Sequence, residues 1–126
     1  MKYYEIELND EVIKLRLTSN AVCEIEKKAN KSILDIMKEV TQTNIVNLLM
    51  YMRRFELPNY SSKEANDLYD KFIDNGYTMQ DVVFKVIYEG LVVSGVMTKE
   101  ELQQLKEVMG IKEKKVKQKL EEISQD

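Results

Sequence analysis

Two short segments at the start of the chain alternate apolar and polar residues with a period of two. The apolar positions are Tyr4, Ile6 and Leu8 in the first segment and Ile13, Leu15 and Leu17 in the second. Alternation of this kind is typical of a β-strand with one buried face. The pattern therefore predicts an antiparallel β-hairpin over residues 1–17, with its apolar face packed on the rest of the chain because two strands alone are rarely stable.

The connection between the two strands has two interpretations. A loop of two residues, Asn9–Asp10, pairs Glu5 with Lys14. A loop of four residues, from Asn9 to Val12, pairs Glu5 with Arg16 instead. Either loop keeps the apolar residues of both strands on one face, whereas a loop of odd length would place carboxylates opposite that face. Burial therefore restricts the register without choosing between the two loops.

Apolar residues at helical spacing follow in short stretches over residues 18–110. Several of these stretches begin with Ser or Thr followed three residues later by Asp or Glu, an arrangement that caps a helix N-terminus. The pairs are Ser32 with Asp35, Ser61 with Glu64, Thr78 with Asp81, and Thr98 with Glu101. Either Thr18 or Ser19 is expected to cap one further helix and Thr43 another, and the predicted helix ends lie near Asn30, Pro58, Gly76, Gly95 and Gly110.

Two of these helices are expected to form the core. Residues 43–57 contain apolar side chains at helical spacing, including Leu48, Leu49 and Met52, and are the best candidate for the central helix. Residues 79–91 are apolar over a wide face, which predicts a helix buried on more than one side. The predicted fold is α+β and mainly α: an N-terminal β-hairpin, a bundle of about five to six short helices, and a charged C-terminal helix or tail. We expect residues 1–110 to form a single globular domain.

Residues 111–126 have a different character from the rest of the chain. Five lysines and four acidic residues surround a narrow apolar stripe of Val116, Leu120 and Ile123. A helix with so narrow a stripe buries little apolar surface by itself. Two interpretations follow: a solvated amphipathic tail, or a segment that becomes helical when its stripe meets a partner. Val116, Leu120 and Ile123 are therefore the candidate partner-binding residues.

The residues that most enzymes use for proton transfer and metal binding are scarce. The chain has no histidine, so the usual base beside a nucleophile is missing. Cys23 is the sole cysteine, which excludes an internal disulfide and a thiolate metal cluster. Because Cys23 is next to Val22 and near Ile25, we expect it to be a small buried hydrophobic residue. We expect no catalytic residues, no metal site and no cofactor.

One acidic group has two interpretations. Asp67, Asp70 and Asp74 recur at spacings of three and four residues, which places their carboxylates on one helix face. Such a face could serve a hydrolase or a cation, but no second set of ligands accompanies it. We expect these carboxylates to be solvated.

The charge distribution argues against a nucleic-acid partner. The net charge is −3 with both signs interspersed, so the whole-chain field should repel a phosphate backbone. The basic concentrations are Arg53–Arg54 beside Tyr51 and the lysines of residues 111–126. They support one alternative function, a small nucleic-acid-binding or regulatory adaptor protein. No apolar run approaches the ~20 residues that cross a bilayer, and no secretion signal is recognisable, so we expect a cytoplasmic protein with no membrane partner.

Two features favour contacts with other proteins. The chain contains seven methionines, whose flexible side chains either fill the core or line an adaptable groove for a helical client. A hairpin with open edges predicts a dimer or a higher homo-oligomer.

The order of these elements resembles the tail assembly chaperones of long-tailed, siphovirus-type bacteriophages and prophages, especially those of Gram-positive hosts. The segments that carry the resemblance lie at residues 13–18, at 21–27, at Lys31–Ser32–Ile33, and at residues 65–70. They correspond to a strand, a helix with a glutamate–lysine pair, a short helix that begins with a small polar residue, and a following bundle. The resemblance covers residues 1–95 and includes no catalytic motif.

The resemblance implies a non-enzymatic function in viral morphogenesis. Members of this family bind the long helical tape-measure protein, keep it soluble and assist polymerisation of the tail tube around it. They act in the bacterial host cytoplasm and are typically absent from the mature virion. In many such phages a ribosomal frameshift produces a longer form whose added domain engages the tail-tube protein. The expected partners are thus the tape-measure protein and, through such a longer product, the tail-tube protein.

Overall fold

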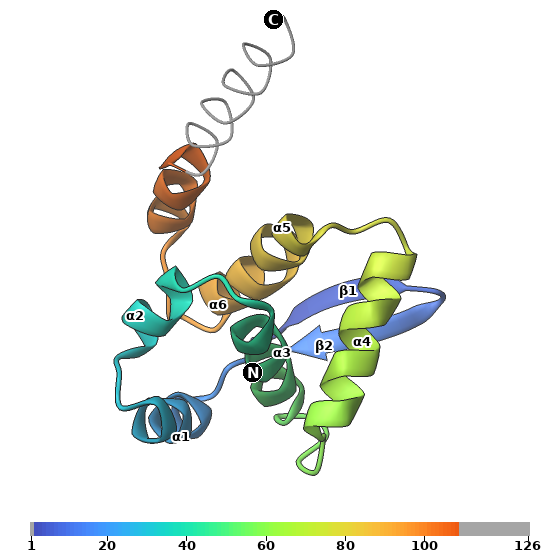
Figure 1. Cartoon of the computed structure of the whole chain (residues 1–126), viewed down its shortest axis with the longest axis horizontal. Helices are drawn as coiled ribbons and strands as arrows, with labels where there is room; N and C mark the ends of the chain where they lie inside the picture. The colour runs from blue at the N-terminus through green and yellow to red at the C-terminus, as the bar shows by residue number, and fades with distance from the viewer. Residues whose placement is uncertain (1, 109–126) are drawn as a thin grey trace, which may run out of the picture.

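The computed structural model describes residues 2–108 of the 126-residue chain. Residues 111–126, and with them Val116, Leu120 and Ile123, lie outside the described residues. Within the described part a two-stranded hairpin is followed by a series of short helices, which confirms the predicted α+β, mainly α fold (Figure 1).

The hairpin consists of β1 (Tyr4–Leu8) and β2 (Glu11–Leu15), which pair antiparallel. Glu5 lies opposite Lys14, so the two-residue loop is the correct interpretation of the pattern. Both residues of the loop Asn9–Asp10 have positive φ, 52° and 64°. These angles are those of a type I′ turn, whose twist matches the twist of paired strands, and Asn and Asp tolerate them better than other side chains do.

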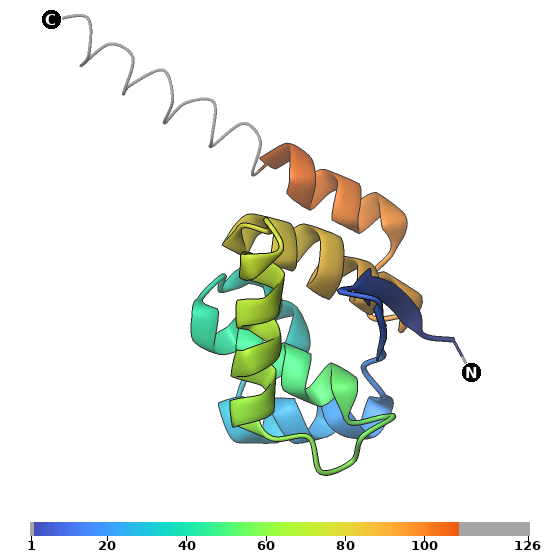
Figure 2. The ribbon, with the colours of Figure 1, turned by 90° about the vertical axis from the view of Figure 1, so that its right-hand side faces the viewer.

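The helices of the described part are short, and the bounds follow in chain order. They are α1 (Ser19–Ala29), α2 (Ile33–Lys38), α3 (Gln42–Arg53), α4 (Ser62–Asp74), α5 (Met79–Asp81), the π-helical segment η1 (Val82–Ile87), α6 (Tyr88–Val93), and a helix over residues 99–108. Because α5, η1 and α6 follow one another without a break, they form one rod with π-helical hydrogen bonding in its middle. Figure 2 shows the helix over residues 99–108 lying along this rod.

Most of the predicted helix starts are confirmed. Side-chain oxygens of Thr18, Ser32 and Thr98 accept hydrogen bonds from backbone N–H groups three residues ahead. The two pairs Ser61 with Glu64 and Thr78 with Asp81 form complete capping boxes. The prediction for α3 was wrong, because Thr41 and not Thr43 is its N-cap. The hydroxyl of Thr41 accepts from the N–H of Asn44 at 3.2 Å, so α3 begins two residues earlier than the apolar pattern indicates.

The centre of the fold is α3, as predicted. Figure 1 shows it between α1 and α2 on one side and α4 with the hairpin on the other. Its buried residues cover more than one face: Ile45, Val46, Leu48, Leu49, Met50, Tyr51 and Met52. The rod formed by α5, η1 and α6 is also buried on more than one side, again as predicted, through Val82, Val83, Phe84, Val86, Ile87, Tyr88, Gly90 and Leu91.

The hairpin is attached to the end of α3. The N–H of Arg16 donates to the carbonyl of Met52 at 2.9 Å, and the guanidinium of Arg53 donates to the carbonyl of Lys14 at 3.0 Å. The apolar face of the hairpin is buried, with Leu15 fully inaccessible. Contacts from α3 thus occupy backbone groups that β2 would otherwise leave open along its outer edge.

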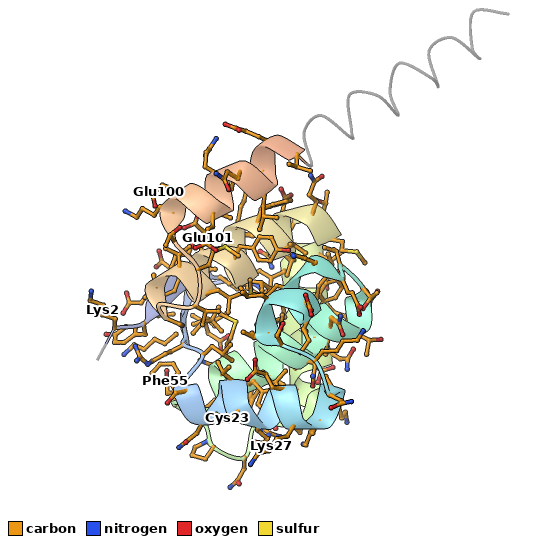
Figure 3. The ribbon with its side chains drawn as sticks, turned by 90° about the vertical axis from the view of Figure 1, so that its left-hand side faces the viewer. Lys2, Cys23, Lys27, Phe55, Glu100 and Glu101 are labelled. Carbon is orange, nitrogen blue, oxygen red and sulfur yellow. The ribbon has the colours of Figure 1, made fainter. Side chains whose placement is uncertain are left out.

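The prediction for Cys23 was wrong, because this side chain is exposed. In α1 the buried residues are Ala21 and Ile25, which lie one turn apart on the inner face. Each residue of an α-helix turns the chain by about 100° about the helix axis, so Cys23, two residues after Ala21, points about 200° away from it. Figure 3 shows Cys23 and Lys27 on the outward face of α1, at the opposite end of the view from Glu100 and Glu101.

One buried hydrogen bond connects two helices that are distant in sequence. The hydroxyl of Tyr88 in α6 donates to the carbonyl of Met37 in α2 at 2.7 Å. Burial raises the pKa of Tyr88 above its ordinary value, so the phenol remains protonated and able to donate at neutral pH. This bond holds the C-terminal turn of α2 against the core.

We expect Tyr88→Phe to lower the free energy of unfolding by about 1–3 kcal/mol, because the Met37 carbonyl would be left without a donor in the interior. Urea unfolding of the full chain measures the effect. Tyr4→Phe is the matched control, since the Tyr4 hydroxyl donates to the Lys85 carbonyl at 2.9 Å at an exposed site where water can replace it. Equal losses for the two variants would contradict the structural role given to the Tyr88 bond.

Candidate partner-binding groove

Large apolar side chains remain exposed at several places in residues 2–108. They are Tyr3, Val12, Leu34, Val40, Leu57, Ile73, Met79 and Val108. Single exposed apolar residues are common on protein surfaces and need no explanation. Leu34 and Val108, however, are 47% and 51% exposed and line the same hollow.

This hollow is a groove between α2 and the helix over residues 99–108. Its volume is about 360 Å³, near the lower end of the range for ligand pockets. Eight residues line it: Leu34, Met37 and Lys38 from α2, Met97 from the preceding turn, and Glu101, Gln104, Leu105 and Val108 from the last helix. We call this set the α2 groove.

The sequence of α2 explains how its wall of the groove arises. Ile33 and Ile36 turn into the core, which leaves Leu34 and Lys38 on the outer face of this six-residue helix. The first turn is held by a hydrogen bond from the N–H of Ile33 to the carboxylate of Glu26, at 2.9 Å. At about 100° per residue the four apolar side chains of α2 cover an arc of about 160°, and Leu34, at one edge of this arc, remains outside the core.

The second wall is positioned by contacts at both ends of its helix. The Thr98 hydroxyl caps the first turn, and Leu102 is 5% exposed and anchors the helix to the core. Farther along, the ammonium of Lys106 lies 3.5 Å from the carboxylate of Glu89 in α6. These contacts leave Leu105 half-buried and Val108 open toward the groove.

The groove combines an apolar interior with charged residues of opposite sign. Met37 and Met97 are 6% and 4% exposed and supply flexible, polarisable side chains at the site. Lys38 comes from one wall and Glu101 from the other, and neither forms an ion pair within residues 2–108. Such a surface suits an amphipathic helix whose apolar side chains enter between the walls. It offers no paired acid and base for a reaction.

Both arginines of the basic pair Arg53–Arg54 contact other residues of the chain. The guanidinium of Arg53 lies 5.4 Å from the ring centroid of Tyr60, in addition to its bond to β2. Arg54 donates to the carbonyl of Tyr60 at 2.9 Å and lies 5.2 Å from the ring centroid of Tyr51. These contacts give both arginines structural roles, so the pair is not a free basic patch.

A more polar hollow of about 270 Å³ lies between β2, α3 and α4. Burial is the main factor that raises the pKa of Tyr60, which lines this hollow, although nearby Arg53 opposes the shift. Lys71 faces Glu11 across the hollow at 3.7 Å, and Glu64 and Asp67 add further carboxylates. Charges of both signs are thus close together, which does not favour a purely anionic ligand.

The acidic residues predicted on one face of α4 lie on the protein surface. Asp67, Asp70 and Asp74 are all exposed. Within residues 2–108 no group of three or more histidines, cysteines or carboxylates is arranged to hold a metal ion.

The sequence patterns identified only part of this groove. The capping pairs at Ser32 and Thr98 predict the two helices that form its walls, whereas Leu34 lies outside the helical spacing of Ile33 and Ile36. The signal that could have found it is the run Ile33, Leu34, Ile36 and Met37, which is too apolar for a short helix with one buried face. Val116, Leu120 and Ile123, the predicted partner-binding residues, lie outside the described residues.

No helix within the described range is long and apolar enough to span a bilayer. Comparison of the chain with protein-family models, with curated proteins and with solved structures finds no match.

Proposed function

We propose that this protein is a non-enzymatic tail assembly chaperone of a long-tailed bacteriophage or prophage, and that it binds the tape-measure protein through the α2 groove. The observation that carries the proposal is the groove itself, an apolar hollow with Leu34 and Val108 exposed at its walls. A long helical client presents apolar faces of the kind that such a groove accepts. We further propose that the protein acts in the host cytoplasm and leaves before the virion is complete.

The small size of the groove is consistent with this function. Eight residues line it, whereas a stable protein–protein interface uses about 20–30 residues on each side. A single contact of this size is expected to be weak. A tape-measure protein is long enough to bind many copies of a small chaperone, so repeated contacts along one client supply the avidity that one groove lacks.

The proposal is tested by producing the tape-measure protein encoded in the same genome with and without this chain. We expect the soluble fraction of the tape-measure protein to rise several-fold in the presence of the full chain, and the two proteins to purify together. Unchanged solubility together with the absence of co-purification would contradict the proposal. As a control, the tape-measure protein is produced together with an unrelated helical protein about as long as this chain, which should not raise its solubility.

The alternative, a nucleic-acid-binding or regulatory adaptor, has weaker support. Its motivating pair, Arg53–Arg54, is engaged by Lys14, Tyr51 and Tyr60. An adaptor of this kind would give a gel shift that disappears steeply as salt is added. We expect no such shift with duplex DNA at moderate salt.

A further inference from the structure

We infer that the α2 groove also accepts residues 111–126 of the same chain, through the stripe of Val116, Leu120 and Ile123. The groove would then be occupied by its own C-terminal segment until a client displaces it. Docking of the segment in the groove does not depend on the proposed function. Only its competition with the tape-measure protein rests on that proposal.

The position of the groove along the chain is the first support. Val108 lines the groove, and Ile111 follows it after only two intervening residues, one of which is Gly110. Glycine readily adopts the backbone angles that reverse a chain after a helix. A segment tethered so closely has an effective concentration of the order of millimolar at the groove. Tethering thus compensates for the small number of lining residues.

The second support is the match in length between the stripe and the groove wall. Val116, Leu120 and Ile123 are spaced four and three residues apart, so they share one face if the segment is helical. This stripe spans seven residue steps, or about 10 Å of helix at 1.5 Å per residue. The groove-lining residues Glu101 and Val108 are also seven steps apart on a described helix. The apolar stripe is therefore as long as the wall it would contact.

A small occupant fits the groove better than a second globular copy. Association of two free copies through eight lining residues would fall well short of the ~20–30 residues of a stable interface. The rim presents both Lys38 and Glu101, and residues 111–126 carry both lysines and carboxylates beside the stripe. Each rim charge therefore has a potential partner of opposite sign in the segment.

The first test uses methyl NMR of the full chain labelled at its methionines. Val116→Asp combined with Leu120→Asp should shift the methyl signals of Met37 and Met97, because charged side chains would not remain in an apolar groove. Gln118→Asp combined with Gln125→Asp adds the same charge away from the stripe and should leave both signals in place. Equal effects of the two pairs, or no effect of either, would overturn the inference. Signals that depend on protein concentration would also overturn it, since they would indicate the segment of a second copy.

The second test adds a synthetic peptide of residues 111–126 to the full chain. A groove that is occupied nine-tenths of the time by its own segment weakens a competitor's apparent affinity about tenfold. The Val116→Asp, Leu120→Asp chain should therefore bind the peptide at least about tenfold more tightly than the unsubstituted chain. Equal affinities would contradict docking of the segment. No client is present in either test, so failure here is distinct from failure of the tape-measure proposal.

Discussion

Replacement of Phe72 by alanine is expected to lower the free energy of unfolding by about 3–5 kcal/mol, the largest stability effect that we predict for a single substitution. Phe72 lies on α4, is completely inaccessible to solvent, and packs against the ring of Tyr77 with centroids 5.1 Å apart. Its removal eliminates the burial of a large apolar side chain and leaves a cavity that the closely packed interior fills only in part.

Ile73 is the matched control because it is the next residue of the same helix and is 38% exposed. We expect Ile73→Ala to cost less than about 1 kcal/mol, as is usual for surface substitutions. Urea unfolding followed by circular dichroism measures both variants. Similar losses would mean that α4 does not present its Phe72 face to the core in the way described.

The second large effect concerns binding. Leu34→Asp combined with Val108→Asp is expected to weaken capture of the tape-measure protein at least tenfold, because each aspartate would place a charge where an apolar side chain of the client docks, at a cost of about 1–3 kcal/mol or more. The two residues come from opposite walls of the α2 groove. Since both side chains are about half exposed, the free energy of unfolding of the protein should change little.

A matched pair of substitutions separates the groove from general surface charge. Val12 and Ile73 are 54% and 38% exposed and do not line the α2 groove. Val12→Asp combined with Ile73→Asp adds the same charge, and we expect it to leave capture unchanged. Co-purification yields of the client with each variant measure the difference. If both pairs reduced the co-purification yield equally, the added charge alone would explain the loss, and the α2 groove would not be the binding site.

The parts of the fold that local chemistry determines were predictable from the sequence. The capping boxes that begin at Ser61 and Thr78 involve residues three apart, so their pattern is visible without knowledge of the fold. Alternation reduced the possible hairpin registers to two, and the choice of the Asn9–Asp10 loop required the observed pairing of Glu5 with Lys14.

The features that were missed depend on how helices meet. Exposure of Cys23 follows from the face of α1 that Ala21 and Ile25 turn inward, and the neighbours of Cys23 in sequence do not reveal it. The π-helical segment η1 within the rod gave no recognisable pattern. The α2 groove joins Leu34 to Leu105 and Val108, which are some 70 residues away in sequence. Such a contact between distant elements follows from tertiary packing and cannot be read from local periodicity.

Amide hydrogen exchange of the full chain, with and without the tape-measure protein, tests whether the α2 groove binds a helical client. Exchange reports local opening along the backbone, so it maps the contact surface without substitutions. We expect added protection to be concentrated in α2 and in residues 97–108, most clearly in the Val116→Asp, Leu120→Asp chain, whose own segment does not occupy the groove. Protection confined to the hairpin or to α4, or unchanged exchange throughout residues 2–108, would contradict it.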